Sequence, residues 1–372
     1  MTHEPVAFLD LGRVLAPLHA PLRDAFDRML DHAGFVLGKE VAAFERALGE
    51  ALGCAGVVGV SSGTDALLAA FLALDLPEDA EILLTPFTFI SSATSILRAG
   101  LRPVFVDLPP GGFHPTVEDF AAAWGPKTAG VLVVHLFGEP VATAEIAALC
   151  AQRGGVLIED CAQAIGAVAV DGRAVGLAGR AGTLSFFPAK NLGALGDGGA
   201  VISNDLAWLA EVRAIRQHGC HVRYAFSRLG GNFRLDAIQA AMLGVLLPEL
   251  EGWIDARRAN AVAYLRDFAA LEAAGSVVLP AFVPGHAWNQ FVIRTERRDA
   301  LAQALSEAQI GSAIYYPSAL HRAKALAKAR PAESMPNAER CCDEVLALPI
   351  YPGLREAERA RVVEVVQATL TC

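Results

Sequence analysis

Short, uninterrupted apolar runs alternate with alanine-rich segments of helical periodicity along the first half of the chain. Six runs have this character: GVVGV (56–60), EILLTP (81–86), RPVFVDL (102–108), AGVLVVHLFG (129–138), GGVLIEDC (154–161) and GTLSFF (182–187). Strands that are buried on both faces have continuous apolar runs, and the helices between them serve as parallel crossovers. The pattern therefore predicts a mainly parallel α/β sheet with helices on both faces and ligands at the carboxyl ends of its strands.

The alternation stops near residue 248, where a long amphipathic segment, LPELEGWIDARRANAVAYLRDFAALEAAG (247–275), predicts a helix. Beyond it we expect a strand at NQFVIRT (289–295), a helix over 298–309, a second strand at GSAIYYP (311–317) and a final helix over 355–370. This order predicts a large domain over 1–247 and a smaller α+β domain over 248–372. Residues 1 to about 38 lie outside the alternation, and we expect them to pack on the small domain or on a partner chain.

The amino-acid composition limits the class of protein and the compartment in which we expect it. The 372 residues are 53% hydrophobic and 19% charged with a net charge of −9, which is typical of a globular protein and does not favour nucleic-acid binding. No run approaches the roughly 18 apolar residues of a membrane-spanning helix, and the N-terminus lacks the pattern of an export signal. The seven cysteines have no regular spacing, so we expect free thiols in the cytoplasm, without a disulfide framework or a metal site.

Three polar groups lie where predicted strands end, and the first is in VSSGTDALL (60–68). A strand turns there into a helix, whose first N–H groups and positive dipole end can bind an anion. The alternative is an ordinary helix cap by Ser61 or Ser62. In VLIEDCAQAIG (156–166), successive side chains alternate between faces, so one of Glu159 and Asp160 points into the ligand crevice. That carboxylate could hold a cationic ring nitrogen, the alternative being a cap or a surface ion pair.

The third group is Lys190, which follows a strand and a proline in SFFPAKNLGALGDGG (185–199). A partly desolvated lysine loses its proton more readily and becomes an amine nucleophile, whereas the alternative is a solvated loop lysine. Ser185 could add a hydroxyl for a nearby anion. An anion site, a carboxylate and a constrained lysine at neighbouring strand ends are what the phosphate, pyridinium nitrogen and aldehyde of pyridoxal phosphate require.

Over nearly its full length the chain resembles the DegT/DnrJ/EryC1/StrS sugar aminotransferases. The resemblance rests on ordered segments that include FLDLGRVLAPL, GFVLGKEVAAFE, GVSSGTDALLAA, TPFTFISSATSILRAGLRPVFVDL, VHLFGEP, IEDCAQAIGA, SFFPAKNLGALGDGGAVISND, GGNFRLDAIQAAML, YYPSALH and LALPIYPGL. It implies a pyridoxal-phosphate enzyme of fold type I, like aspartate aminotransferase, with a seven-stranded large-domain sheet and a smaller α+β C-terminal domain. GGNF and WNQF depart from the family pattern, and WNQF lacks a histidine that is often found there.

The resemblance also implies roles for individual residues. Lys190 would be the catalytic lysine that forms the internal aldimine and moves the proton, and Asp160 would pair with the pyridinium nitrogen. The other cofactor contacts that the resemblance implies are Gly63, Thr64 and Ser185 to the phosphate, Gln163 on the 3-hydroxyl side of the ring, Phe89 stacked on the ring, and Asn232 reaching the phosphate of the neighbouring subunit. Asn232 thereby implies a homodimer with shared sites. For Phe89, a core position is the alternative.

For the sugar nucleotide, the resemblance gives several candidate contacts and no single set. His321 matches a histidine near the sugar nucleotide, and the candidates for its diphosphate also include Arg223, Arg228 and Arg234. His135 belongs to a family motif in which a structural role is equally expected, and Glu159 is interpreted as structural.

The expected reaction is a transamination. Some relatives carry a histidine in place of the lysine and act as dehydratases, but this chain has Lys190. The resemblance implies transfer of the amino group of L-glutamate, through pyridoxamine phosphate, to a dTDP- or UDP-linked 3- or 4-keto sugar. The alternatives are a non-catalytic regulator that binds pyridoxal phosphate, or another fold-type I enzyme such as an aldolase or a desulfurase.

Overall fold

The computed structural model describes residues 4–327 and 334–371. A seven-stranded sheet forms its centre in the order β1-β7-β6-β5-β4-β2-β3, and within this sheet only β7 runs antiparallel to its neighbours. The strands are β1 (Gly56–Val60), β2 (Glu81–Leu84), β3 (Arg102–Phe105), β4 (Thr128–Val134), β5 (Val156–Asp160), β6 (Ala181–Ser185) and β7 (Gly199–Ser203). The predicted mainly parallel α/β fold is confirmed, and each of the six apolar runs overlaps a strand.

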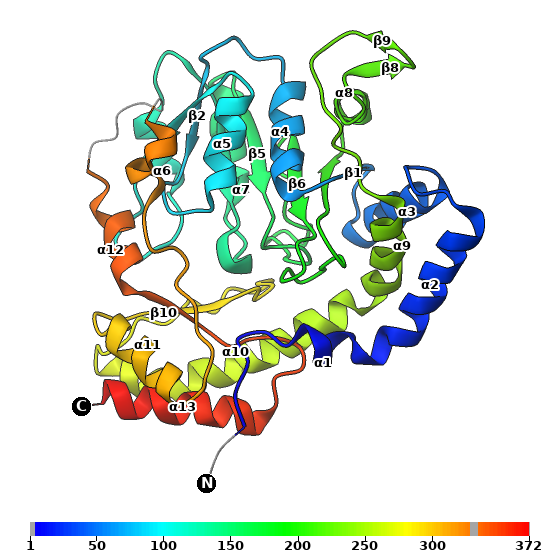
Figure 1. Ribbon diagram of the computed structural model, residues 1–372. Helices are drawn as coiled ribbons and strands as arrows, with labels where there is room; N and C mark the ends of the chain where they lie inside the picture. The colour runs from blue at the N-terminus through cyan, green and yellow to red at the C-terminus, as the bar shows by residue number, and fades with distance from the viewer. Residues whose placement is uncertain (1–3, 328–333, 372) are drawn as a thin grey trace.

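Helices cover both faces of this sheet because neighbouring strand residues point to opposite sides. On β4, Leu132 packs with α4 (Gly63–Ala73), α5 (Ile90–Arg98) and α8 (Leu206–Ile215) on one face. Val131 and Val133 pack on the other face with α6 (Val117–Ala123) and α7 (Thr143–Gln152). Towards β1, that second face is covered by α3 (Lys39–Leu52) and α9 (Ala237–Leu246). Figure 1 shows α4 and α5 side by side along the sheet.

The C-terminal part is built around two antiparallel strands, β10 (Phe291–Arg294) and β11 (Val345–Leu348). They pack against α10 (Leu250–Ala273), α11 (Arg298–Glu307), α12 (Pro336–Glu344) and α13 (Glu356–Leu370). In Figure 1, α10, α11 and α13 lie below the large sheet and α12 lies at its left. The strand expected at 311–317 is wrong, since only Ala313 bridges to the sheet, through Ala347. This segment leaves the sheet because Tyr316 instead contacts Phe87 and Phe89 of the large-sheet side.

The N-terminal segment spans both parts of the molecule. The Val6 N–H donates to the Gln309 carbonyl at 2.9 Å, and Arg13 pairs with Glu358 at 2.9 Å, so residues near α1 (Leu11–Leu15) lie on the C-terminal part. After η1 (Ala16–Leu18), helix α2 (His19–His32) packs instead against α9. The division of the chain into domains at residue 247 stays a prediction.

One continuous helical stretch, Ala237–Ala273, is long and apolar enough to cross a membrane by length and composition. It consists of α9, η3 (Leu247–Glu249) and α10. Leu243 and Leu246 of α9 are fully buried in the core that α9 shares with α2 and α3, and Arg257 and Asn260 of α10 are polar and also buried. These residues show that parts of the stretch pack inside the folded chain, and apolar helices of a protein core pass the same test of length and composition.

Candidate active site

The end of β5 delivers two acids to opposite faces, as the alternation predicts. Asp160 is buried, and its carboxylate accepts hydrogen bonds from the Ser92 hydroxyl at 2.9 Å and from the Ala162 N–H at 3.1 Å. Burial raises the pKa of Asp160, while these two donors and the charge of Lys190 act against the rise. The site thus holds a desolvated carboxylate, which a cationic group would stabilise strongly.

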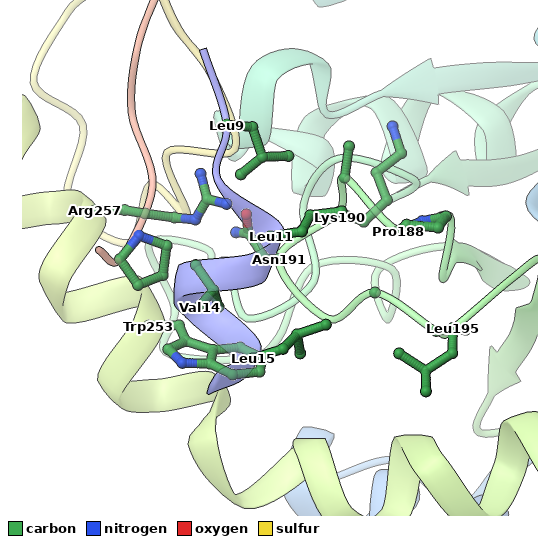
Figure 2. A pocket seen from close by; sticks show the side chains of 14 residues that line it. Leu9, Leu11, Val14, Leu15, Pro188, Lys190, Asn191, Leu195, Trp253 and Arg257 are labelled. Atoms are coloured by element: carbon green, nitrogen blue, oxygen red, sulfur yellow. The ribbon is translucent and has the colours of Figure 1, made fainter. Parts of the chain in front are cut away.

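Lys190 lies in the loop after β6, on the same edge of the sheet. The loop is fixed by the Lys190 N–H, which donates to the Phe187 carbonyl at 2.8 Å, and by the Ala194 N–H, which donates to the Phe186 carbonyl at 2.7 Å. In Figure 2 the Lys190 side chain extends away from Leu15 and Trp253, towards the large sheet. Burial lowers the pKa of its amine from 10.5 to about 8, and the Asp160 charge partly offsets this. The lysine is therefore close to losing its proton near neutral pH.

The lowered pKa of Lys190 predicts how its amine reacts in the cofactor-free protein. We expect the Lys190 amine to react with an acylating reagent at a rate that rises with pH and levels off above about 8. Below that pH the amine is mostly protonated and cannot act as a nucleophile. Peptide mass spectrometry across a pH series measures the labelling, with the exposed Lys39 as the internal reference. A Lys190 profile that coincides with the Lys39 profile would contradict the assignment.

The start of α4 offers an anion site beside these groups. Ser62 caps the helix, with its hydroxyl accepting the Asp65 N–H at 3.1 Å, so the expected cap is present. The N–H groups of Gly63 and Thr64 donate to no residue in the described part of the chain. A Cβ on Gly63 would lie 2.7 Å from the Cβ of Ser185, so glycine is what allows the helix start to approach the end of β6. The helix start, with its two free amides, therefore lies against Ser185, whose Oγ accepts the Phe187 N–H at 3.3 Å, and free amides at a helix start are what a phosphate requires.

Gln163 is held from both ends of its amide. Its Oε1 accepts the Phe137 N–H at 2.6 Å, and its Nε2 donates to the Tyr316 hydroxyl at 3.3 Å. Phe89 is 56% exposed, with its ring 6.3 Å from the Tyr316 ring, so it does not occupy the core position that was its alternative. Its stacking role, like the 3-hydroxyl role of Gln163, stays a prediction.

The remaining predicted residues lie at the edges of the site. Asn232 and Arg234 line a cavity of about 670 Å³ together with Ser61 and Ser62 of the same chain. The His321 Nε2–H donates to the Glu339 carboxylate on α12 at 2.8 Å. The neighbouring Leu320 N–H donates to the carbonyl of Pro86, three residues before Phe89.

The other two diphosphate candidates belong to the segment of the β8 (Cys220–Val222) and β9 (Ala225–Phe226) hairpin. Arg228 pairs with Glu211 at 3.2 Å, whereas Arg223 lies over the Tyr224 ring at the exposed tip. The substrate roles of these arginines stay predictions.

Glu159, on the face opposite Asp160, has a full set of hydrogen bonds. It accepts from His135 at 3.0 Å and from the backbone N–H groups of Gly176, Ala178 and Gly179 at 2.9 to 3.0 Å. His135 Nδ1 accepts the Val141 N–H, so its proton is on Nε2, which donates to Glu159. With every acceptor satisfied and no exposed surface, the pair anchors the ends of β4 and β5.

Sequence reasoning missed Ser92 and Tyr316. Ser92 is one of several hydroxyl residues on α5, and its contact with Asp160 spans 68 positions. Tyr316 reaches Gln163 from 153 positions away and was quoted only as part of a family segment. Nothing in the local pattern around either residue indicates the partner.

The residues present fit pyridoxal phosphate. Free amides at a helix start suit its phosphate, and a buried carboxylate without a strong cationic partner suits its pyridinium nitrogen. A lysine with a pKa of about 8 suits its aldehyde, because a neutral amine is what adds to a carbonyl.

Comparison with known proteins agrees with this geometry. Residues 19–367 match the model of the DegT/DnrJ/EryC1/StrS aminotransferase family. A UDP-N-acetyl-3-dehydro-alpha-D-glucosamine 3-aminotransferase of Acidithiobacillus ferrooxidans is 39% identical over 98% of each chain. A protein of Geobacillus stearothermophilus named pleiotropic regulatory protein is 39% identical over 96% of this chain and 97% of its own.

Two further similarities come from Streptomyces venezuelae. A dTDP-3-amino-3,4,6-trideoxy-alpha-D-glucose transaminase is 36% identical over 97% of this chain and 95% of its own. The crystal structure of DesV in complex with a ketimine intermediate is similar with a TM-score of 0.94 at 35% identity, covering 98% of each chain. Sequence, fold and site geometry agree, and the chain belongs to the DegT/DnrJ/EryC1/StrS aminotransferase family, whose members are pyridoxal-phosphate enzymes of fold type I.

Proposed function

We propose that this protein transfers the amino group of L-glutamate to the 3-keto group of a nucleotide-linked sugar. The observation that carries the proposal is the lysine with a lowered pKa beside a buried aspartate, at a sheet edge that also has a free helix start. The position on the sugar is supported by two relatives, from A. ferrooxidans and S. venezuelae, whose names place the nitrogen at carbon 3. The family assignment favours transamination over the aldolase and desulfurase alternatives.

The residues divide the work by their chemistry. When bound, pyridoxal phosphate supplies an electron sink for the carbon that loses its proton. The Gly63 and Thr64 amides and the Ser185 hydroxyl would hold the phosphate, and Asp160 would keep a proton on the ring nitrogen. Lys190 would remove the proton from the α-carbon of glutamate and would return it to the cofactor carbon that carries the amino group. One amine acting first as base and then as acid needs a pKa near the working pH, and about 8 meets that need.

A substrate panel tests the carbon and the nucleotide. We expect amino transfer from L-glutamate to UDP- or dTDP-linked 3-keto sugars at least about tenfold faster, in kcat/KM, than to matched 4-keto sugars, since a misplaced reacting atom loses orientation. Mass spectrometry of the amino sugar measures product. Faster reaction of the 4-keto series would contradict the 3-keto assignment while leaving transamination in place.

A regulator that binds pyridoxal phosphate without turnover is the second candidate, since the G. stearothermophilus relative carries a regulatory name. Incubation of the loaded protein with L-glutamate alone distinguishes the two. An aminotransferase releases about one 2-oxoglutarate per subunit as the visible cofactor band disappears, whereas a regulator releases none.

A homodimer with shared sites is part of the proposal, as is a cytoplasmic location. Exposed apolar side chains support the dimer: Phe26 and Leu30 on α2 are 43% and 53% exposed, and Val222, Tyr224 and Phe226 of the β8–β9 hairpin are 63 to 74% exposed. Large apolar side chains that are exposed on each of these two elements are more typical of a surface that a second chain covers. The cysteines of the described residues are all free, which is typical of a reducing compartment.

Mixing two inactive variants tests whether Asn232 serves the partner's site. Lys190→Ala and Asn232→Ala each remove one contribution, and a mixed dimer would regain one complete site if Asn232 acts across the interface. Random mixing then restores about a quarter of wild-type activity, because half the dimers are mixed and each has one of two sites intact. If Asn232 instead serves the site of its own chain, beside which it lies, the mixture stays as inactive as its components.

A further inference from the structure

Two buried asparagine side chains hold the backbone on either side of Lys190. Asn191 is 3% exposed, and its Nδ2 donates to the Ala287 carbonyl at 2.8 Å. Asn289 is 6% exposed, and its Nδ2 donates to the Asn191 Oδ1 at 3.0 Å and to the Ala189 carbonyl at 3.4 Å. A single amide from the C-terminal half of the chain therefore contacts both neighbours of the lysine.

The turn that presents Asn289 is held in an unfavourable conformation. Trp288 has a φ of 47°, which is rare for a bulky side chain. The His286 ring stacks on the Trp288 ring with centroids 3.8 Å apart, and its Nδ1 accepts the Trp288 N–H at 2.8 Å. Strained backbone persists only where the surroundings over-determine it, and such positions concentrate at functional sites.

Arg257 secures the same turn from α10. Its Nη1 donates to the carbonyls of Trp288, Asn289 and Ile350 at 2.8 to 3.3 Å, and within the described part of the chain it pairs with no carboxylate. A buried guanidinium without an anion costs free energy, and the three carbonyl contacts offset part of that cost. The same contacts hold the backbone of the turn in place. Figure 2 shows Arg257 extending from α10 towards Asn191 and the Lys190 loop.

The turn also contacts the opposite side of the site. The Ala287 N–H donates to the Gly138 carbonyl at 2.9 Å, and the Gln290 N–H donates to the Phe137 carbonyl at 3.2 Å. Phe137 is the residue whose own N–H holds Gln163. Residues 287–290 therefore connect the Gln163 side of the site to the Lys190 loop.

We propose that Asn289 is a positioning residue that fixes the loop of Lys190, and thereby the direction of its amine, through Asn191 and Ala189. This inference rests on the proposed aminotransferase function only for its kinetic consequence. Asn289 contacts the loop backbone and not the reacting atoms, so its loss should leave substrate binding largely intact. It should instead reduce the fraction of time that the amine is correctly placed.

The test compares Asn289→Ala with Asn260→Ala. Asn260 lies on α10 and is also 6% exposed, and among the described residues its side chain bonds only to Ala256 and Arg359 of the C-terminal part. We expect Asn289→Ala to lower kcat by about 10- to 100-fold with KM for the keto sugar within about threefold, because an ångström of misplacement costs that much. Asn289→His, whose Nδ1–H can occupy the position of the lost amide donor, should recover most of the loss. Asn260→Ala should leave kcat within about threefold.

Amide hydrogen exchange in the cofactor-free protein provides a readout that does not depend on activity. Asn289→Ala should speed exchange at Lys190 and Ala194, whose N–H groups bond within the loop. Unchanged exchange over 186–195, or equal effects of Asn260→Ala, would overturn the proposal. If the wild-type protein showed no aminotransferase activity, the proposed function would fail while the exchange comparison still decided the role of Asn289.

Discussion

Lys190→Ala should fold normally and lose turnover by roughly 10⁴-fold, the upper end of what a positioned proton-transfer group contributes. The alanine cannot join covalently to pyridoxal phosphate, so the variant should also lack the visible absorbance of a lysine-bound cofactor. The loop itself should persist, because the hydrogen bonds that hold it come from the backbone N–H groups of Lys190 and Ala194 and from the side chains of Asn191 and Asn289, none of which the substitution removes. Circular dichroism and thermal unfolding establish folding, while absorbance and product release measure the loss.

Lys39→Ala is the matched control, since Lys39 is 73% exposed and pairs only loosely with Glu40 at 3.9 Å. It should keep the absorbance and the activity of the wild-type protein. Appreciable turnover by Lys190→Ala, with the cofactor bound, would show that another group moves the proton and would refute the assignment of the site.

Asp160→Asn should lower kcat by roughly 10²- to 10³-fold, as the loss of one preorganised electrostatic contact does in other enzymes. The amide is close in shape to the carboxylate and can still meet the Ser92 hydroxyl and the Ala162 N–H, so the fold should be retained. What is lost is the negative charge that keeps a proton on the ring nitrogen, and with it the pull of electrons into the ring. Single-turnover kinetics with L-glutamate measure this step directly.

The same substitution carries a second, independent signature. The Asp160 charge raises the pKa of Lys190, so its removal should move that pKa below about 8. The labelling profile of Lys190 should accordingly shift to lower pH, because the neutral amine is then present at lower pH. Asp299→Asn, on an 86% exposed side chain of α11, is the control and should change neither property. A Lys190 profile that moves upward would mean that Asp160 does not act on this amine.

Much of the large sheet follows from the sequence, because its strands are buried on both faces and have continuous apolar runs. Strand β7 gives no such signal, since GAVIS directly follows the glycine-rich loop and contains only three apolar residues beyond its glycine. Strand β11 is similarly hidden, because it begins where α12 ends. The segment 311–317 has the composition of a strand, yet tertiary contacts of Tyr316 draw it away from the sheet.

The residues of the candidate site likewise fall into those that the sequence identifies and those that only the structure reveals. Asp160 and Lys190 follow strands directly, so the rule that ligands bind at carboxyl ends identifies them without a structure. Ser92, Tyr316 and Asn289 reach the site from segments that are distant along the chain, through side chains whose local surroundings have no distinctive pattern. Asn289 in particular depends on a strained turn at Trp288 that three separate contacts stabilise.

The central claim is that one lysine and one cofactor carry an amino group between two substrates in separate halves of a reaction. The most direct measurement adds L-glutamate to the loaded protein, removes it by gel filtration, and then adds a UDP- or dTDP-linked 3-keto sugar. We predict that the visible cofactor band disappears with release of about one 2-oxoglutarate per subunit, and returns as about one amino sugar forms. A band that persists with glutamate, or that disappears and does not return with any nucleotide-linked keto sugar, would contradict the account.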